Sequence, residues 1–167
     1  MSLQRSLELI WLVMPAYCAN MAPPFVKYWR GWNRPIHRKW LGDHKTVMGF
    51  GFGVLVGVVM AFVQSHVAFP SPLWRPELWP VLGLVLGAGA MCGDSAKSLI
   101  KRRIGIAPGH SWIPADQLDF MIGALIPLQF IVPLLPSEIV LLLIFTFAAD
   151  IAVNHASFYL GIRDTKW

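Results

Sequence analysis

Residues 46–69 read TVMGFGFGVLVGVVMAFVQSHVAF and contain no aspartate, glutamate, lysine or arginine. A helix needs about 20 predominantly apolar residues to cross the hydrocarbon core of a bilayer, which is roughly 30 Å thick. The stretch is therefore predicted to be a membrane-spanning helix. Its glycines would let a second helix approach closely, within the chain or in a dimer, and we favour packing within the chain; they are Gly49, Gly51, Gly53 and Gly57.

Four further apolar stretches are candidate spans: 6–26, 78–93, 120–135 and 137–160. The first is read as a retained span rather than a cleaved signal, and its prolines predict a kink or an early end. Only 14% of the chain is charged, against about 25% in soluble domains. No internal repeat or linker is visible. The expected fold is an all-α integral membrane protein, one domain over 1–167 with about five transmembrane helices.

Lysines and arginines are concentrated in alternate loops. Twelve of the 14 lie in the first loop, the third loop and the C-terminal tail, and only Arg5 and Arg75 lie elsewhere. The positive-inside rule then places the N-terminus outside and the C-terminus in the cytoplasm of a multi-pass protein of the cell membrane. The net charge of +5 is explained by this topology or by phosphate binding, and we expect no nucleic-acid partner.

Three polar clusters lie at the predicted cytoplasmic boundary: residues 42–46, residues 93–103, and Asp116 with Asp119. The span 78–93 would rise only about 24 Å as a helix, which places Asp94 at or just inside that boundary. Ionisable groups near a bilayer core normally face a protein interior or a watery cavity. The sequence therefore predicts one polar cavity that opens to the cytoplasm.

Asp94, Lys97, Ser98 and Lys101 are spaced to share one face of a helix. An aspartate can ligate a hard divalent cation, and lysines can neutralise phosphate oxygens. An ion pair with lysines that extend to the membrane surface explains the pattern equally well. The Lys97-Ser98 pair is not a P-loop, because the glycines of that motif are missing.

Asp116 and Asp119 precede the apolar stretch 120–135. Asp116 as the N-cap of a helix, with Asp119 in its first turn, would explain both residues. Two carboxylates one turn apart can also ligate a metal, and capping does not exclude that role. Both interpretations stay open at this point.

Other polar or reactive side chains lie within the apolar stretches. Asp150, with Asn154 and His155, is either functional or paired within the helix bundle. Cys18 and Cys92 are expected to be small buried apolar residues, with neither a disulfide nor a metal site.

The segment 93–106, GDSAKSLIKRRIGI, and the segment 116–120, DQLDF, together resemble the signature of CDP-archaeol synthases, a family distantly similar to CDP-diacylglycerol synthases. Further matches cover the chain in order: PAY at 15–17, AN at 19–20, LGDHKT at 41–46, YLG at 159–161 and the terminal Trp167. APGHS at 107–111 replaces a Lys-Asp pair and a His-Gly-Gly stretch of the broader family, and Gln117 replaces a common arginine. These departures favour the archaeal branch.

The resemblance implies that the chain transfers a cytidylyl group from CTP to an unsaturated isoprenoid ether-lipid phosphate, which releases pyrophosphate. It implies magnesium, with manganese as a substitute, and it leaves the oligomeric state open. Asp94, Asp116 and Asp119 would be the metal ligands, and Lys97 would join them in catalysis. The expected CTP-binding residues are Asp43, Lys45, Thr46, Lys97, Ser98, Lys101 and Arg102.

Two other classes of protein remain as alternatives. A CDP-alcohol phosphotransferase also uses aspartates and a metal at a membrane surface, but this chain lacks the run of aspartates that its signature requires. A small anion transporter would distribute its charges along a pore. Here the charges collect at one face of the membrane, and only Asp150 lies deep in a span.

Overall fold

The computed structural model describes residues 2–26, 33–43, 45–107 and 110–159. Its elements are α1 (Leu3–Met21), α2 (Pro23–Val26), α3 (Arg38–Leu41), α4 (Val47–Ser65), the 3-10 helix η1 (Pro76–Leu78), α5 (Trp79–Arg103), α6 (Ala115–Leu128) and α7 (Pro136–Tyr159). Within the described ranges, the extended pairing is limited to an isolated bridge between Pro35 and Thr46. The predicted all-α class is confirmed.

Four segments are long and apolar enough to cross a membrane: Leu3–Val26, Val47–Ser65, Pro76–Arg103 and Pro136–Ala156. They correspond to four of the five predicted spans, so the expected multi-pass architecture is confirmed. The first span does end early as a continuous helix, because α1 stops at Met21 and α2 begins at Pro23.

The predicted span 120–135 is wrong in its bounds. The helix α6 starts earlier, at Ala115, and its 14 residues rise about 21 Å, less than the thickness of a bilayer core. After Leu128 the chain turns, and the Gln129 side chain binds the backbone of Leu134, with its Oε1 accepting the Leu134 N–H at 2.7 Å. A proline at position 133 cannot continue a helical hydrogen-bond ladder. The apolar stretch on which the prediction rested therefore continues beyond the end of this helix.

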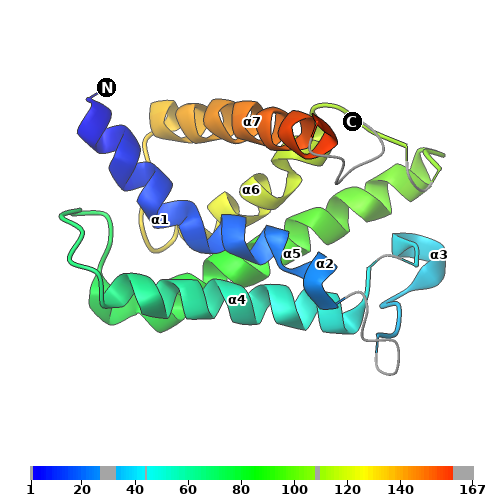
Figure 1. Ribbon diagram of the computed structural model, residues 1–167, viewed down its shortest axis with the longest axis horizontal. Helices are drawn as coiled ribbons and strands as arrows, with labels where there is room; N and C mark the ends of the chain where they lie inside the picture. Colours follow the sequence, from blue (N-terminus) through cyan, green and yellow to red (C-terminus); the bar gives the residue numbers. More distant parts are fainter. Residues whose placement is uncertain (1, 27–32, 44, 108–109, 160–167) are drawn as a thin grey trace.

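Helix α5 lies at the centre of the bundle and packs against α1, α4 and α6 (Figure 1). Leu82 and Leu86 of α5 and Leu12 of α1 are fully buried in the resulting core. Helix α7 packs mainly on α6. A hydrogen bond of 2.7 Å between the hydroxyls of Tyr17 and Thr146 joins α7 to α1.

Glycines allow the helices to approach closely on both sides of α5. A Cβ atom at Gly57 would lie 2.9 Å from the Cα atom of Gly87, across the contact between α4 and α5. At Gly93, a Cβ atom would collide with the backbone carbonyl of Asp119 in α6. The predicted packing role is confirmed for Gly57, whereas a side chain at Gly51 would meet nothing within 4 Å.

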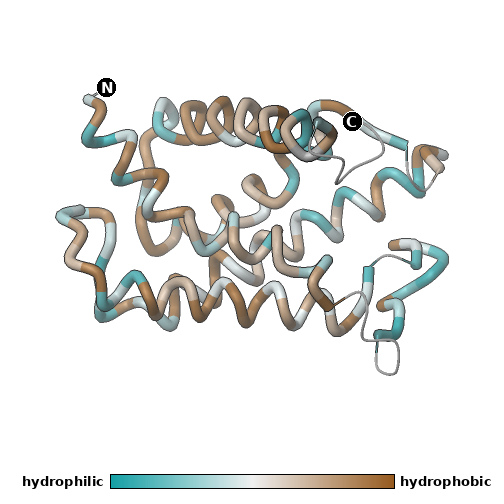
Figure 2. Tube along the Cα trace, viewed as in Figure 1, coloured by the Kyte–Doolittle hydropathy of each residue, from teal (hydrophilic) through white to brown (hydrophobic). Residues whose placement is uncertain are grey.

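Hydrophilic residues gather at one end of the bundle. Figure 2 shows hydrophobic residues along most of α4 and α7, and hydrophilic residues around α3 and along the last turns of α5. In Figure 1, α3 and the C-terminal ends of α5 and α7 lie at the same end, opposite the start of α1. The three polar clusters of the sequence therefore meet at one end of the helices.

Candidate active site

The last turns of α5 carry the acid–lysine face that the spacing predicted. The helix continues without a break to Arg103, so Asp94, Lys97 and Lys101 do lie on successive turns. Ser98 uses its hydroxyl locally and donates a 3.0 Å hydrogen bond to the backbone carbonyl of Asp94. Its predicted bond to a nucleotide would require this hydroxyl to rotate.

The first turn of α6 supplies the other two carboxylates. The interpretation of Asp116 as the N-cap is wrong, because Pro114 occupies that position and no side chain caps the helix. Asp116 instead lies inside the first turn, where its Oδ2 accepts the backbone N–H of Trp112 at 2.5 Å. Asp119 follows one turn later and is buried, so both acids face α5 rather than water.

The ammonium group of Lys97 lies among the three aspartates. Its Nζ is 2.8 Å from Oδ2 of Asp119, 3.0 Å from Oδ1 of Asp116 and 3.5 Å from Oδ1 of Asp94. The Lys97 side chain is only 16% exposed. At this low exposure the ion pairs are weakly screened, so a single cation organises carboxylates from two helices.

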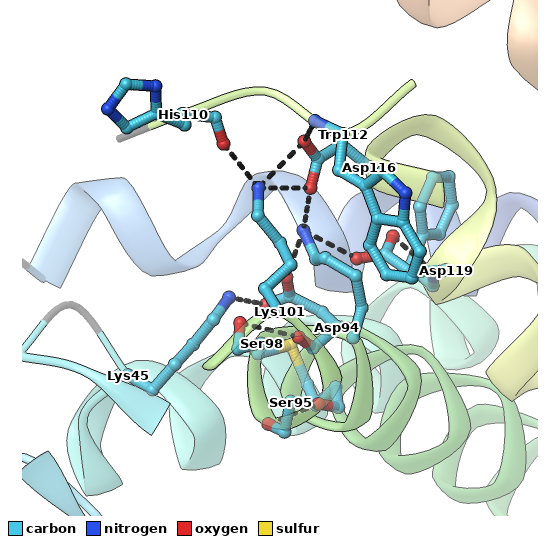
Figure 3. A network of polar contacts seen from close by, with 12 residues as sticks. Lys45, Asp94, Ser95, Ser98, Lys101, His110, Trp112, Asp116 and Asp119 are labelled. Atoms are coloured by element: carbon cyan, nitrogen blue, oxygen red, sulfur yellow. Dashed lines mark hydrogen bonds and ion pairs between the residues drawn. The ribbon is translucent and has the colours of Figure 1, made fainter. Parts of the chain in front are cut away.

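Lys101 forms a second bridge from α5 to the segment before α6. Its Nζ donates to both carboxylate oxygens of Asp116, at 3.0 and 2.9 Å, and to the carbonyl of His110 at 2.5 Å. Figure 3 shows the Lys101 ammonium group between the His110 carbonyl and the Asp116 carboxylate. Asp116 is therefore held by two lysines and one backbone N–H, which makes it a pre-positioned oxygen ligand.

The third polar cluster reaches the site from the start of α4. Lys45 pairs with Oδ2 of Asp94, and a 2.8 Å bond from the Ile36 N–H to the Lys45 carbonyl holds its backbone. Thr46 caps α4 through a 3.1 Å bond from the Gly49 N–H. The predicted helix start and the predicted convergence of all three clusters are confirmed.

Some predicted residues lie apart from this cluster. Asp43 is exposed and pairs with Arg38 at 3.2 Å, and Arg102 donates to the carbonyl of Ile106. Asp150 accepts a 2.8 Å bond from Asn154, consistent with pairing in the bundle. The structure thus brings Asp94, Asp116, Asp119, Lys45, Lys97 and Lys101 together, and leaves Asp43 and Arg102 outside.

An apolar groove of about 430 Å³ adjoins the cluster between α5 and α6. Lys97 and Asp119 lie at its polar side, and most of the remaining lining is small or aliphatic: Cys92, Gly93, Ala96, Ile100, Trp112, Ala115, Ile122, Gly123 and Ile126. Sequence reasoning did not find this groove or Trp112. Gly93 and Ala96, which are small residues on adjoining turns of α5, could have indicated a groove on this helix. Which residues of α6 lie opposite them could not be predicted from the sequence.

The oxygen-rich acidic set suits a hard divalent cation. Magnesium usually takes one or two carboxylates together with substrate phosphates rather than an all-protein cage. Among the described residues, no group of three acidic, histidine or cysteine side chains is arranged to hold a metal ion, so a magnesium ion here would need phosphate oxygens as further ligands. The Lys97 ammonium already marks a point at which three carboxylates meet one positive charge. Asp94 and Asp116 are the more exposed pair and fit a metal shared with a phosphate.

Comparison with known proteins gives a consistent result. Residues 2–167 match the family model described as CarS-like, CDP-archaeol synthase. CDP-archaeol synthases of Thermococcus gammatolerans and Halorubrum lacusprofundi are 32% and 34% identical; the matches cover 95% and 94% of this chain, and 94% of each relative. A solved intramembrane enzyme for archaeal membrane lipid biosynthesis matches with a TM-score of 0.70 and 30% identity, over 89% of this chain and 93% of that one.

The fold and the site define a multi-pass, all-helical membrane protein with a charged site at one end of its bundle. Within that class, the matches settle which family is involved. The chain belongs to the CDP-archaeol synthase family.

Proposed function

We propose that this chain forms CDP-archaeol at the aspartate–lysine cluster, from CTP and an unsaturated archaeal ether-lipid phosphate. A phosphate oxygen of the lipid attacks the α-phosphorus of CTP, the new P–O bond forms, and the α–β phosphoanhydride bond breaks to release pyrophosphate. Both substrates are polyanions. Catalysis then depends mainly on positioning and on neutralising charge.

One juxtaposition carries the proposal: a compact set of lysines and aspartates lies beside an apolar groove in a membrane protein of this family. Lys45, Lys97 and Lys101 together could offset the charge of a triphosphate. Asp94 and Asp116, supported by Asp119, would hold magnesium, which supplies further positive charge against the phosphates when bound. No protein nucleophile is required, because the lipid phosphate is itself the nucleophile.

The groove between α5 and α6 suits the apolar part of the lipid. Its lining beyond Lys97 and Asp119 is almost entirely hydrophobic, and its volume lies within the usual range of small-molecule pockets. A chain in this groove would place its phosphate at the polar side, next to Lys97. The groove would therefore align the lipid phosphate with the nucleotide.

The prediction that Cys92 is buried is wrong, because Cys92 is exposed and lines this groove, where its thiol provides a direct probe. In a Cys18→Ala variant, digeranylgeranylglyceryl phosphate is expected to slow the reaction of Cys92 with N-ethylmaleimide severalfold, because the lipid chain covers the thiol. Glycerol 1-phosphate, which lacks the chains, should leave the rate unchanged. Equal rates with and without the lipid would place its chains elsewhere.

The site faces the cytoplasm, where CTP is available; the basic residues of the first and third loops support this orientation. Single cysteines would be introduced for Glu77 and Ser111 after removal of Cys18 and Cys92. On intact cells, a membrane-impermeant maleimide should label Glu77→Cys, and should label Ser111→Cys only after lysis. The reverse pattern would invert the topology.

The reaction itself is tested with purified protein in detergent, labelled CTP, magnesium and digeranylgeranylglyceryl phosphate. A labelled CDP-lipid and an equal amount of pyrophosphate are expected, and EDTA should abolish both. Product formed only from CDP-lipid and an alcohol would instead indicate a CDP-alcohol phosphotransferase. No turnover with any nucleotide or lipid phosphate would favour the transporter alternative.

A further inference from the structure

The position of the Lys97 ammonium has a consequence for how a divalent cation enters the site. Lys97 contacts Asp94, Asp116 and Asp119 at once, at distances of 3.5, 3.0 and 2.8 Å. No other described lysine contacts more than one of these acids: Lys45 pairs with Asp94, and Lys101 pairs with Asp116. Lys97 is therefore the common counter-ion of the acidic set.

An ammonium group and a metal ion compete for the same oxygen lone pairs. A magnesium ion lies about 2.0–2.1 Å from its ligand oxygens, whereas a lysine ammonium lies at hydrogen-bond distance from them. A carboxylate oxygen that is positioned to accept a hydrogen bond from the ammonium group is therefore not positioned to ligate the magnesium ion. The low exposure of Lys97 and Asp119 also means that water cannot readily screen two cations placed side by side.

We propose that Lys97 is an internal substitute for the divalent cation, which holds the three carboxylates together in the metal-free protein and is displaced from them when the metal binds. This inference rests on the proposed function, since it concerns the same site. Lys97 lies on the α5 face that carries Lys101, so the released ammonium remains beside the site and gains a new anionic partner when the triphosphate arrives. Without nucleotide, loss of the three ion pairs opposes metal binding.

The test measures Mn²⁺ binding to the purified protein without nucleotide, from the amplitude of the free Mn²⁺ signal in electron paramagnetic resonance. Lys97→Met should bind Mn²⁺ about tenfold more tightly than the wild type or better, because no ammonium then competes for the carboxylates. Lys97→Arg keeps the positive charge and should bind as weakly as the wild type. Lys101→Met is the matched control, since it removes the same charge from a lysine that pairs with only one of the three acids, Asp116, and it should tighten binding much less.

Lys97→Gln serves as a second variant if the methionine variant does not fold, and it should also bind more tightly than the wild type. Affinities in Lys97→Met and Lys97→Gln that do not exceed those of the wild type or of Lys101→Met would overturn the proposal. Mn²⁺ binding is measured without turnover. Failure to detect cytidylyl transfer in the assay above would therefore refute the proposed function, but it would not decide whether Lys97 competes with the metal.

Discussion

Replacing Asp94 with asparagine should lower the rate of cytidylyl transfer by about a thousandfold, comparable to the loss of a principal electrostatic contact in an active site. The Asp94 carboxylate faces Lys45 and Lys97 and is one of the two acids that we propose to hold magnesium against a phosphate. A neutral amide has the same shape, but it removes the negative charge that both lysines and a divalent cation require. The loss should appear in kcat, measured with saturating CTP and lipid.

The same variant should still fold, because the charges that it leaves have other partners. Lys97 keeps Asp116 and Asp119, and Lys45 lies near enough to the surface to be hydrated. Gel filtration and thermal unfolding should therefore resemble the wild type. Glu77→Gln is a matched control, since it makes the same chemical change at an exposed position in η1. A wild-type rate in Asp94→Asn would remove the metal role of Asp94.

Substitution of Gly93 by alanine is expected to reduce both stability and activity. A Cβ atom at this position would collide with the Asp119 carbonyl and lie 3.0 Å from the Gly123 Cα atom, and both obstacles are helix backbone. Overpacking of this kind typically destabilises a protein by about 1–3 kcal/mol. The separation of α5 from α6 would also draw Asp119 away from Lys97, so turnover should fall even where the variant is folded.

Gly51→Ala is the control for Gly93→Ala, because both glycines are in membrane-spanning helices and a Cβ at Gly51 meets no atom within 4 Å. That change should keep or slightly raise stability, since alanine favours a helix over glycine by roughly 0.5–1 kcal/mol. Thermal unfolding in detergent and the transfer assay would be run on both variants. Equal stability and activity in the two variants would contradict the close contact between α5 and α6.

Much of the site was predictable because it depends on helix periodicity and on the membrane boundary. The spacing of Asp94, Lys97 and Lys101 required one face of a helix, and α5 provides it. The predicted topology brought residues 42–46, 93–103 and 116–119 to one side of the membrane, and Lys45 does meet Asp94 there. These features are local in sequence or follow from counting membrane spans.

The remaining features depend on tertiary contacts that periodicity does not encode. The choice of Lys97 rather than Lys101 as the common partner of three acids depends on how closely Gly93 and Gly123 let α5 approach α6. The exclusion of Arg102 depends on the turn after α5, where the Ile106 carbonyl accepts its side chain. Family resemblance identified the acids but could not supply this geometry.

A structure of the protein with magnesium and CTP bound, determined in lipid nanodiscs, would test the central claim most directly. The triphosphate should contact Lys97 and Lys101, with the metal between the phosphates and the carboxylates of Asp94 and Asp116. The Lys97 ammonium should have left the three aspartates. A nucleotide bound away from this cluster, for example on the exposed basic residues of α3, would contradict the claim that the aspartate–lysine cluster is the site of cytidylyl transfer.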